Sequence, residues 1–175
     1  MIEAGNRAAA DVLKTQLSVF RSDGDYVRAK LYEKVAPHIA PHAVFATNTS
    51  GLSITELAKG FDENLRKRFC GVHFFNPPRY MHLVELIATS DTDPAILDRL
   101  ETFLTTVLGK GCIRAKDTPN FIANRVGIFS MLAAIHEAEK FGLPFDIVDD
   151  LTGSKLGRAK SGTFRTADVV GIDTL

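Results

Sequence analysis

The hydrophobic positions in the first two thirds of the chain alternate between short apolar runs and longer helical stripes. The short runs are rich in β-branched and aromatic side chains, a pattern typical of buried strands. They cover residues 43–47 (AVFAT), 71–75 (GVHFF), 83–87 (LVELI) and 112–115 (CIRA). Apolar residues at helical spacing predict helices over residues 3–20, 26–39, 52–57 and 93–108. Strands that alternate with helices predict an α/β unit.

Two of these helices carry clear start signals. Ser53 and Glu56 have the spacing of a capping box. Asp93 followed by Pro94 is a natural N-cap and first helical residue. Gly109 suits the position just beyond the end of that second helix. These signals predict where the helices begin and end.

Beyond residue 120 the pattern is helical throughout. Apolar residues recur at helical spacing over residues 121–141, 146–151 and 163–170. The chain is therefore expected to divide into an α/β part, residues 1–116, and an all-helical part, residues 117–175.

Composition narrows the range of partners. The chain has 175 residues, and its 21 Lys plus Arg balance its 21 Asp plus Glu. A net charge of zero argues against nucleic acid and against an anionic membrane as partners. No apolar stretch reaches membrane-spanning length, and the N-terminus lacks the layout of a secretory signal.

The cysteines and histidines indicate neither a disulfide framework nor a metal site. Cys70 and Cys112 are too few and too far apart in the sequence, so reduced thiols in a cytoplasmic protein are the better interpretation. His38 and His42 have i,i+4 spacing, but Pro41 between them breaks a helix. No metal site is predicted.

The run at residues 83–87 contains a carboxylate, Glu85, among apolar side chains. Its burial costs free energy unless a partner compensates, and His73 in the run 71–75 is the candidate. Such a carboxylate would hold the imidazole in one tautomer, as in a general base with its orienting group. Taken singly, a structural His and a solvated Glu are commoner. With Asn76 three residues after His73, the functional interpretation is favoured.

The polar loop at residues 48–51 (NTSG) directly follows the run 43–47. Ligands bind beyond the carboxyl ends of strands in open α/β sheets, so Asn48 and Ser50 are candidates for a ligand site. On the residues alone, the commoner alternative is that both side chains only make hydrogen bonds within a turn.

Five motifs occur along the chain in a set order. They are residues 46–50 (ATNTS), 73–77 (HFFNP), 83–85 (LVE), 117–125 (DTPNFIANR) and 157–161 (GRAKS). Together they resemble the 3-hydroxyacyl-CoA dehydrogenases over about residues 26–175. The resemblance implies an α/β fold, with a partial Rossmann-like parallel sheet followed by a truncated all-helical domain. It also implies NAD-dependent oxidation of 3-hydroxyacyl-CoA to 3-oxoacyl-CoA in fatty-acid β-oxidation.

The resemblance implies catalytic roles for four residues. His73 would remove the proton of the substrate hydroxyl, and Glu85 would orient His73. Ser50 and Asn124 would hydrogen-bond the reacting oxygen. The expected substrate is an acyl-CoA bound at these positions.

For the NAD cofactor, the resemblance implies contacts from Arg28, Asn48 and Asn76. Arg28 stands where the family usually has Lys, which keeps the charge with a different geometry, and Asp23 matches a family Glu only weakly. The Gly-x-Gly-x-x-Gly turn that normally holds a dinucleotide does not occur in the chain. Residues 109–111 (GKG) lack the third Gly and follow a predicted helix.

The chain therefore resembles a dehydrogenase that begins partway through its cofactor domain and ends within its helical domain. A fragment, a truncated gene product and a domain completed by another polypeptide all fit this pattern. We expect little or no NAD-dependent activity from the isolated chain, and a strand edge that favours a homo-oligomer or association with another chain. The alternative is a non-catalytic remnant acting as an interaction or dimerisation module. A dehydrogenase of another 3-hydroxy acid is disfavoured by the HFFNP run.

Overall fold

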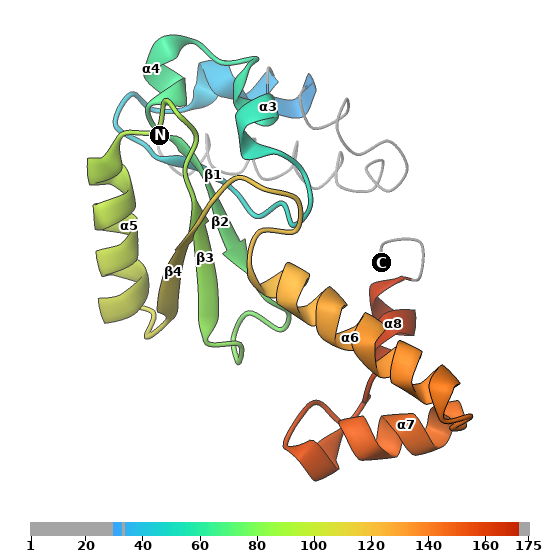
Figure 1. The fold of residues 1–175 in the computed structure, drawn as a ribbon. Coiled ribbons are helices and arrows are strands. Elements are labelled where there is room, and N and C mark those ends of the chain that lie inside the picture. The colour runs from blue at the N-terminus through green and yellow to red at the C-terminus, as the bar shows by residue number, and fades with distance from the viewer. Residues whose placement is uncertain (1–29, 33, 172–175) are drawn as a thin grey trace. The chain divides into compact units, whose positions relative to one another are not determined.

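The computed structural model describes residues 30–32 and 34–171. The chain divides into two compact units, Met1–Phe121 and Ile122–Leu175 (Figure 1). All described strands belong to the first unit, and the described part of the second is helical. The predicted fold class, a Rossmann-like α/β unit followed by helices, is confirmed. The helix expected over residues 3–20 lies outside the described residues, as do Asp23 and Arg28.

Four strands form one sheet in the order β1-β2-β3-β4, and each lies where the sequence predicted a strand. They are β1 (Phe45–Thr47), β2 (Phe69–Phe74), β3 (Leu83–Ile87) and β4 (Gly111–Ala115). β1 pairs with β2 and β3 pairs with β4 in parallel, whereas β2 and β3 run antiparallel. A parallel sheet was expected. The observed sheet is mostly parallel, with one antiparallel pair of strands, β2 and β3. The connection of residues 75–82 is shorter than the crossover of about a dozen residues that parallel neighbours need.

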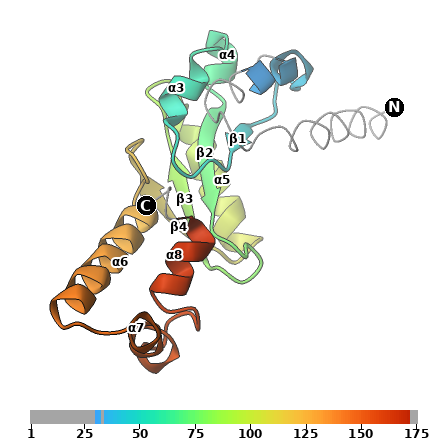
Figure 2. The ribbon, with the colours of Figure 1, turned by 90° about the vertical axis from the view of Figure 1, so that its right-hand side faces the viewer.

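The two faces of the sheet carry separate hydrophobic clusters, because side chains alternate along each strand. Phe69 of β2 and Ile87 of β3 belong to one cluster, together with residues of α3 (Ile54–Ala58). Val72 of β2 belongs to the other cluster, together with residues of α5 (Pro94–Thr106). Figure 2 shows α3 and α5 on opposite sides of the sheet. The first unit is thus built in layers, with the sheet between helices.

The remaining helical segments of the first unit are short. Residues 30–32 and 34–35 are helical within the predicted helix 26–39, and they lead into the 3₁₀ helix η1 (Ala36–His38). The start of α5 is as predicted, since the Asp93 carboxylate accepts a hydrogen bond from Ala95 N–H at 2.9 Å. This cap satisfies one of the N–H groups that a helix leaves without a partner at its first turn.

Gly71 of β2 allows α3 to lie close to the sheet. A Cβ atom at Gly71 would lie 3.0 Å from Ile87 Cβ and Cδ1, and 3.2 Å from Ile54 Cδ1. Any side chain at this position would push Ile54, the first residue of α3, away from β2. The glycine therefore sets the distance between α3 and the strand that carries His73.

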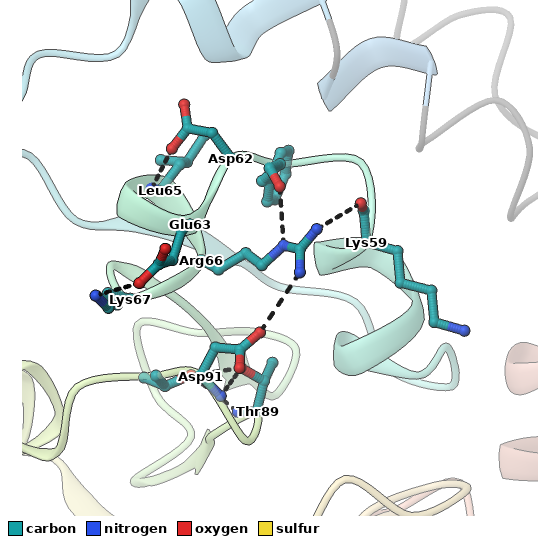
Figure 3. Close-up of polar contacts among 10 residues, drawn as sticks. Lys59, Asp62, Glu63, Leu65, Arg66, Lys67, Thr89 and Asp91 are labelled. Atoms are coloured by element: carbon teal, nitrogen blue, oxygen red, sulfur yellow. Dashed lines mark hydrogen bonds and ion pairs between the residues drawn. The ribbon is translucent and has the colours of Figure 1, made fainter.

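Arg66, at the end of α4 (Glu63–Arg66), hydrogen-bonds the loop that connects α3 and α4 (Figure 3). Its guanidinium donates from Nε to the Phe61 carbonyl at 2.8 Å and from Nη2 to the Lys59 carbonyl at 3.2 Å. Its Nη1 lies 3.9 Å from the Asp91 carboxylate. These bonds satisfy backbone carbonyl groups of a loop, which is a structural role.

The second unit contains the helices that the sequence predicted after residue 120. They are α6 (Ala123–Lys140), α7 (Phe145–Thr152), the 3₁₀ helix η2 (Ser154–Leu156) and α8 (Phe164–Val170). The buried Asp149 carboxylate of α7 accepts hydrogen bonds from the N–H groups of Phe164 at 2.6 Å and Arg165 at 3.2 Å. This contact anchors the first turn of α8 to α7.

The first unit ends at Phe121, beyond the division after residue 116 that the sequence suggested. Phe121 is 2% exposed and belongs to the hydrophobic cluster that contains α3. Asp117 hydrogen-bonds the first turn of α3. These side chains attach residues 117–121 to the first unit. None of the described helices is long and apolar enough to cross a membrane.

Candidate active site

The histidine and the carboxylate singled out above lie where β2 and β3 pair. The antiparallel register places His73 of β2 directly opposite Glu85 of β3. Side chains of directly opposed residues project from the same face of the sheet, within contact distance. His73 Nδ1 lies 2.7 Å from Glu85 Oε2. The predicted hydrogen bond of the His73–Glu85 pair is thus confirmed.

The His73–Glu85 pair is enclosed by protein. His73 is 4% exposed and Glu85 is 0% exposed. A carboxylate only accepts hydrogen bonds, so the proton of this bond lies on Nδ1, and in the neutral imidazole the lone pair is on Nε2. Among the described residues, no buried side-chain nitrogen or oxygen lacks a hydrogen-bond partner. The arrangement is that of a general base with its orienting group.

Two aromatic rings contact the His73 imidazole. The Phe75 ring lies 4.5 Å away between centroids, at 61° to the imidazole plane. The Phe121 ring lies 5.6 Å away, at 60°. Both are edge-on arrangements, which suit the charge distribution of aromatic rings. Sequence reasoning missed Phe121, because an apolar residue ahead of an amphipathic helix carries no local sign of a contact with residue 73.

Asn48 joins the carboxyl ends of β1 and β2, which lie at the same edge of the sheet because the two strands are parallel. Its Oδ1 accepts a hydrogen bond from Phe74 N–H at 2.7 Å. Ser50 follows in the same loop, and Asn76 follows the end of β2. Asn48, Ser50 and Asn76 are all exposed. The structure therefore places three predicted site residues beyond these two strand ends.

Asp117 holds the N-terminus of α3, just beyond the loop that carries Ser50. Its carboxylate accepts hydrogen bonds from Ile54 N–H at 2.9 Å, Thr55 N–H at 2.8 Å and the Ser53 hydroxyl at 2.8 Å. Burial alone would raise the pKa of Asp117, but the hydrogen bonds from Thr55, Ile54 and Ser53 outweigh it and hold this pKa below its usual value. Ser53 Oγ accepts from Glu56 N–H at 3.2 Å, as predicted, and Asp117 supplies the rest of the cap.

The other predicted site residues lie apart from this group or outside the described residues. Asn124 is the second residue of α6 and belongs to the second unit, so its role beside His73 stays a prediction. Arg28 lies outside the described residues. Among residues 30–32 and 34–171, no three His, Cys, Asp or Glu side chains are placed to hold a metal ion.

The sequence matches a family model described as "3-hydroxyacyl-CoA dehydrogenase, NAD binding domain" over residues 24–118. The chain is 47% identical, over 148 residues, to a probable 3-hydroxyacyl-CoA dehydrogenase of Bacillus subtilis. That alignment covers 85% of this chain and 19% of the relative. The residues that the family model matches include the His73–Glu85 pair.

Two solved structures have a similar fold. FadB2 of M. tuberculosis superposes with a TM-score of 0.75 at 33% identity, covering 88% of this chain and 53% of that one. The (S)-3-hydroxybutyryl-CoA dehydrogenase PaaH1 of Ralstonia eutropha superposes with a TM-score of 0.73 at 29% identity, covering 87% and 53%. The chain thus spans about half the length of these structures and about a fifth of the Bacillus relative.

Proposed function

The chain belongs to the 3-hydroxyacyl-CoA dehydrogenase family, and we propose that it takes part in the NAD-dependent oxidation of 3-hydroxyacyl-CoA to 3-oxoacyl-CoA. The observation that carries this proposal is the buried hydrogen bond of 2.7 Å between His73 Nδ1 and Glu85 Oε2. In this proposal the pair supplies a positioned base, the group that accepts the proton of the substrate hydroxyl.

His73 is the proposed base. Its Nε2 lone pair takes the proton of the substrate hydroxyl, while Glu85 holds Nδ1–H and stabilises the imidazolium that forms. A base positioned in this way contributes about 10²–10⁴-fold in rate. NAD, when bound, supplies the acceptor for the hydride that leaves the carbon bearing this hydroxyl.

Ser50 and Asn124 are proposed to hydrogen-bond the reacting oxygen. Ser50 suits this role because its loop is anchored on both sides, by Asn48 at the end of β1 and by Asp117 at the start of α3. In this proposal the Ser50 hydroxyl and the Asn124 amide hold the oxygen where charge develops as the proton leaves.

The residues at the carboxyl edge of the sheet fit only part of an NAD molecule. Exposed amides of Asn48 and Asn76 suit the nicotinamide end, and Arg28 is proposed beside them. The pyrophosphate is normally held by a Gly-rich turn at a helix N-terminus, and the sequence contains no such turn. We therefore propose that this chain by itself holds NAD weakly.

The proposed substrate is an acyl-CoA of fatty-acid β-oxidation. Support comes from the similarity to the (S)-3-hydroxybutyryl-CoA dehydrogenase of Ralstonia eutropha and from membership of the 3-hydroxyacyl-CoA dehydrogenase family. Turnover of 3-oxoacyl-CoA compounds of increasing length, measured by NADH absorbance, tests this assignment. Equal turnover of free 3-oxo acids would contradict a requirement for CoA.

The role of His73 is tested by the His73→Gln variant. We expect kcat for acetoacetyl-CoA reduction to fall by about 10²–10⁴-fold with a small change in KM, because only proton transfer is lost. The assay compares the variant with the parent chain at saturating NADH and is run long enough to record the low turnover expected of the parent. Turnover of the variant equal to that of the parent would refute the proposed base.

Cofactor binding by the chain alone is tested separately, by calorimetric titration with NADH. Weak or no binding, together with little or no turnover of acetoacetyl-CoA, is the expected result. Micromolar binding with turnover typical of the family would show that the chain holds the dinucleotide without a Gly-rich turn.

A second candidate function is a non-catalytic interaction module. It is favoured by α6, on which Val126, Phe129 and Leu132 are all more than half exposed. An exposed apolar patch of this kind marks an interaction surface, so we propose that the chain associates with another copy or another chain. Light scattering of the purified chain and of Phe129→Asp tests this. A monomer at all concentrations would contradict self-association.

We also propose that the protein is cytoplasmic. Cys70 and Cys112 are free thiols, and burial raises the pKa of Cys70 to about 11, which keeps this thiol protonated and unreactive. Both features suit a reducing compartment. Cell fractionation with an antibody against the chain provides the measurement, and recovery from a membrane or secreted fraction would contradict the proposal.

A further inference from the structure

We propose that Phe121 is a positioning residue for His73: its ring holds the imidazole at the angle at which Nε2 meets the substrate hydroxyl. The inference rests on the proposed function, in which His73 is the base, and adds a residue to which no role was assigned. It is carried by the ring contact, by the backbone conformation that produces this contact, and by the anchoring of the turn at residues 117–121.

The plane of the His73 imidazole is set by rotation about the Cβ–Cγ bond. The hydrogen bond from Nδ1 to Glu85 restrains this rotation from one edge of the ring. The rings of Phe75 and Phe121 both meet the imidazole edge-on, at 61° and 60°. Packed against the imidazole, these rings restrict that rotation.

The two phenylalanines differ in how firmly they are held. Phe75 is partly exposed, just beyond the end of β2. Phe121 is 2% exposed and packed into the cluster that contains Leu57 and Ile87. A ring packed into a dense core cannot swing away, so Phe121 is the firmer support for His73.

The backbone at Phe121 adopts a conformation that a bulky residue rarely takes. Asn120 has φ +61° and Phe121 has φ +46°, both in the left-handed region. Such residues cost free energy, persist only where their surroundings hold them, and gather at functional sites. Here the conformation turns the chain just before α6 begins at Ala123 and places the Phe121 ring in the core.

The turn that carries Phe121 is anchored at its other end. Phe121 N–H donates to the Thr118 carbonyl at 2.9 Å, and Asp117 is bonded to Ile54 and Thr55 at the start of α3. A Cβ atom at Gly51 would lie 3.7 Å from Asn120 Oδ1. The turn at residues 117–121 therefore lies against the loop of Ser50 as well as against His73.

The chain offers a matched control for Phe121. Phe61 is 3% exposed and belongs to the same hydrophobic cluster. Its aromatic neighbours are Tyr32, Phe45 and Phe69, not His73. Phe121→Leu and Phe61→Leu therefore remove the same atoms from the same cluster, and only one of them removes a ring from the imidazole.

The experiment is NMR of the histidine ring ¹H and ¹⁵N nuclei in the chain itself, without NAD or substrate. The His73 Nδ1–H signal is assigned by its loss in His73→Gln. We expect this signal in the parent and in Phe61→Leu. In Phe121→Leu we expect it to broaden and to exchange with water at least about tenfold faster, since the ring moves and opens to solvent. If Phe121→Leu does not fold, Phe121→Met and Phe61→Met, closer in volume, give the same comparison.

A His73 signal unchanged in the Phe121 variant would overturn the inference, as would an equal change in the Phe61 variant, which indicates general loosening of the core. Because this measurement needs no turnover, its result is distinct from failure of the proposed dehydrogenase function. Where turnover is measured, Phe121→Leu should lower kcat at least tenfold with KM within about threefold, and Phe61→Leu should leave both near the parent values.

Discussion

The His73–Glu85 pair and the Lys67–Glu63 pair have the same nitrogen-to-oxygen distance, 2.7 Å, but lie in opposite surroundings. The side chains of the first pair are 5% and 0% exposed, and those of the second are 54% and 83% exposed. A distance alone therefore does not distinguish a buried pair from a surface pair. What distinguishes them is whether water could replace a partner that is removed.

For the exposed pair, water takes the place of either side chain, and dissolved salt screens the attraction. For the buried pair, removal of one partner leaves a polar group in a medium that solvates it poorly. The buried pair is consequently costly to disrupt, and its geometry is held by the sheet register. Such rigid geometry suits a catalytic base and orienting group.

The largest effect is expected when His73 is replaced and Glu85 is kept. His73→Leu removes a hydrogen bond from a fully buried carboxylate, so we expect the free energy of unfolding to fall by about 3–5 kcal/mol. Urea denaturation followed by circular dichroism measures it. In the double variant His73→Leu/Glu85→Leu the buried charge is gone too, and much of the loss should be recovered. A double variant less stable than the single one would contradict this account.

A second test compares a closely packed position with an open one, by adding a methyl group at each. In Gly71→Ala the new methyl group meets Ile87 and Ile54 at 3.0–3.2 Å, and overpacking of this kind costs about 1–3 kcal/mol. Gly127 of α6 is the control, since a Cβ there meets nothing within 4 Å. Gly127→Ala should stabilise by roughly 0.5–1 kcal/mol, because alanine favours a helix. Equal effects at both positions, read from urea midpoints, would show that α3 is not closely packed on β2.

Asp117 is half-buried, so its exposure is intermediate between those of the two pairs. Asp117→Ala removes the cap of α3, at a cost of about 1 kcal/mol. The folded-state pKa of Asp117 is lowered, so the charged carboxylate stabilises the fold above its unfolded pKa of about 3.9. That contribution is lost as the pH falls through the lower, folded-state pKa.

Urea midpoints measured from pH 6 down to pH 2 check this expectation. The parent should lose stability with acid below about pH 4, and Asp117→Asn should lose less over the same range. Identical pH profiles for the parent and Asp117→Asn would indicate that the carboxylate charge makes no net contribution.

The smallest effect is expected at the exposed pair. Lys67 lowers the pKa of Glu63 mainly through their hydrogen bond, but both side chains remain in water, so Lys67→Met should leave the urea midpoint unchanged within error. Raising the salt concentration to 1 M should not separate the variant from the parent. If Lys67→Met lowered the free energy of unfolding as much as Asp117→Ala, the exposure of an ion pair would be a poor guide to its contribution to stability.

The features predicted best from sequence are those that depend on neighbouring residues. The cap at Asp93 and the apolar run around Glu85 follow from side chains within a few positions of one another. Contact between Glu85 and His73 was also predictable, because few nearby groups could compensate a carboxylate in that run. Contacts of Asp117 with Ile54, across 63 positions, had no local sign.

The sequence by itself determined the four described strands, the helices α3, α5 and α6, and the choice of His73 and Glu85 as the proposed base and its partner, because local periodicity and the cost of burying charge act within short stretches. Tertiary structure decided the antiparallel register that sets His73 opposite Glu85. It also decided that Phe121, in a left-handed turn, contacts the imidazole. These arrangements depend on how distant segments pack together, and the free energy of that packing is shared among many residues rather than carried by any one motif.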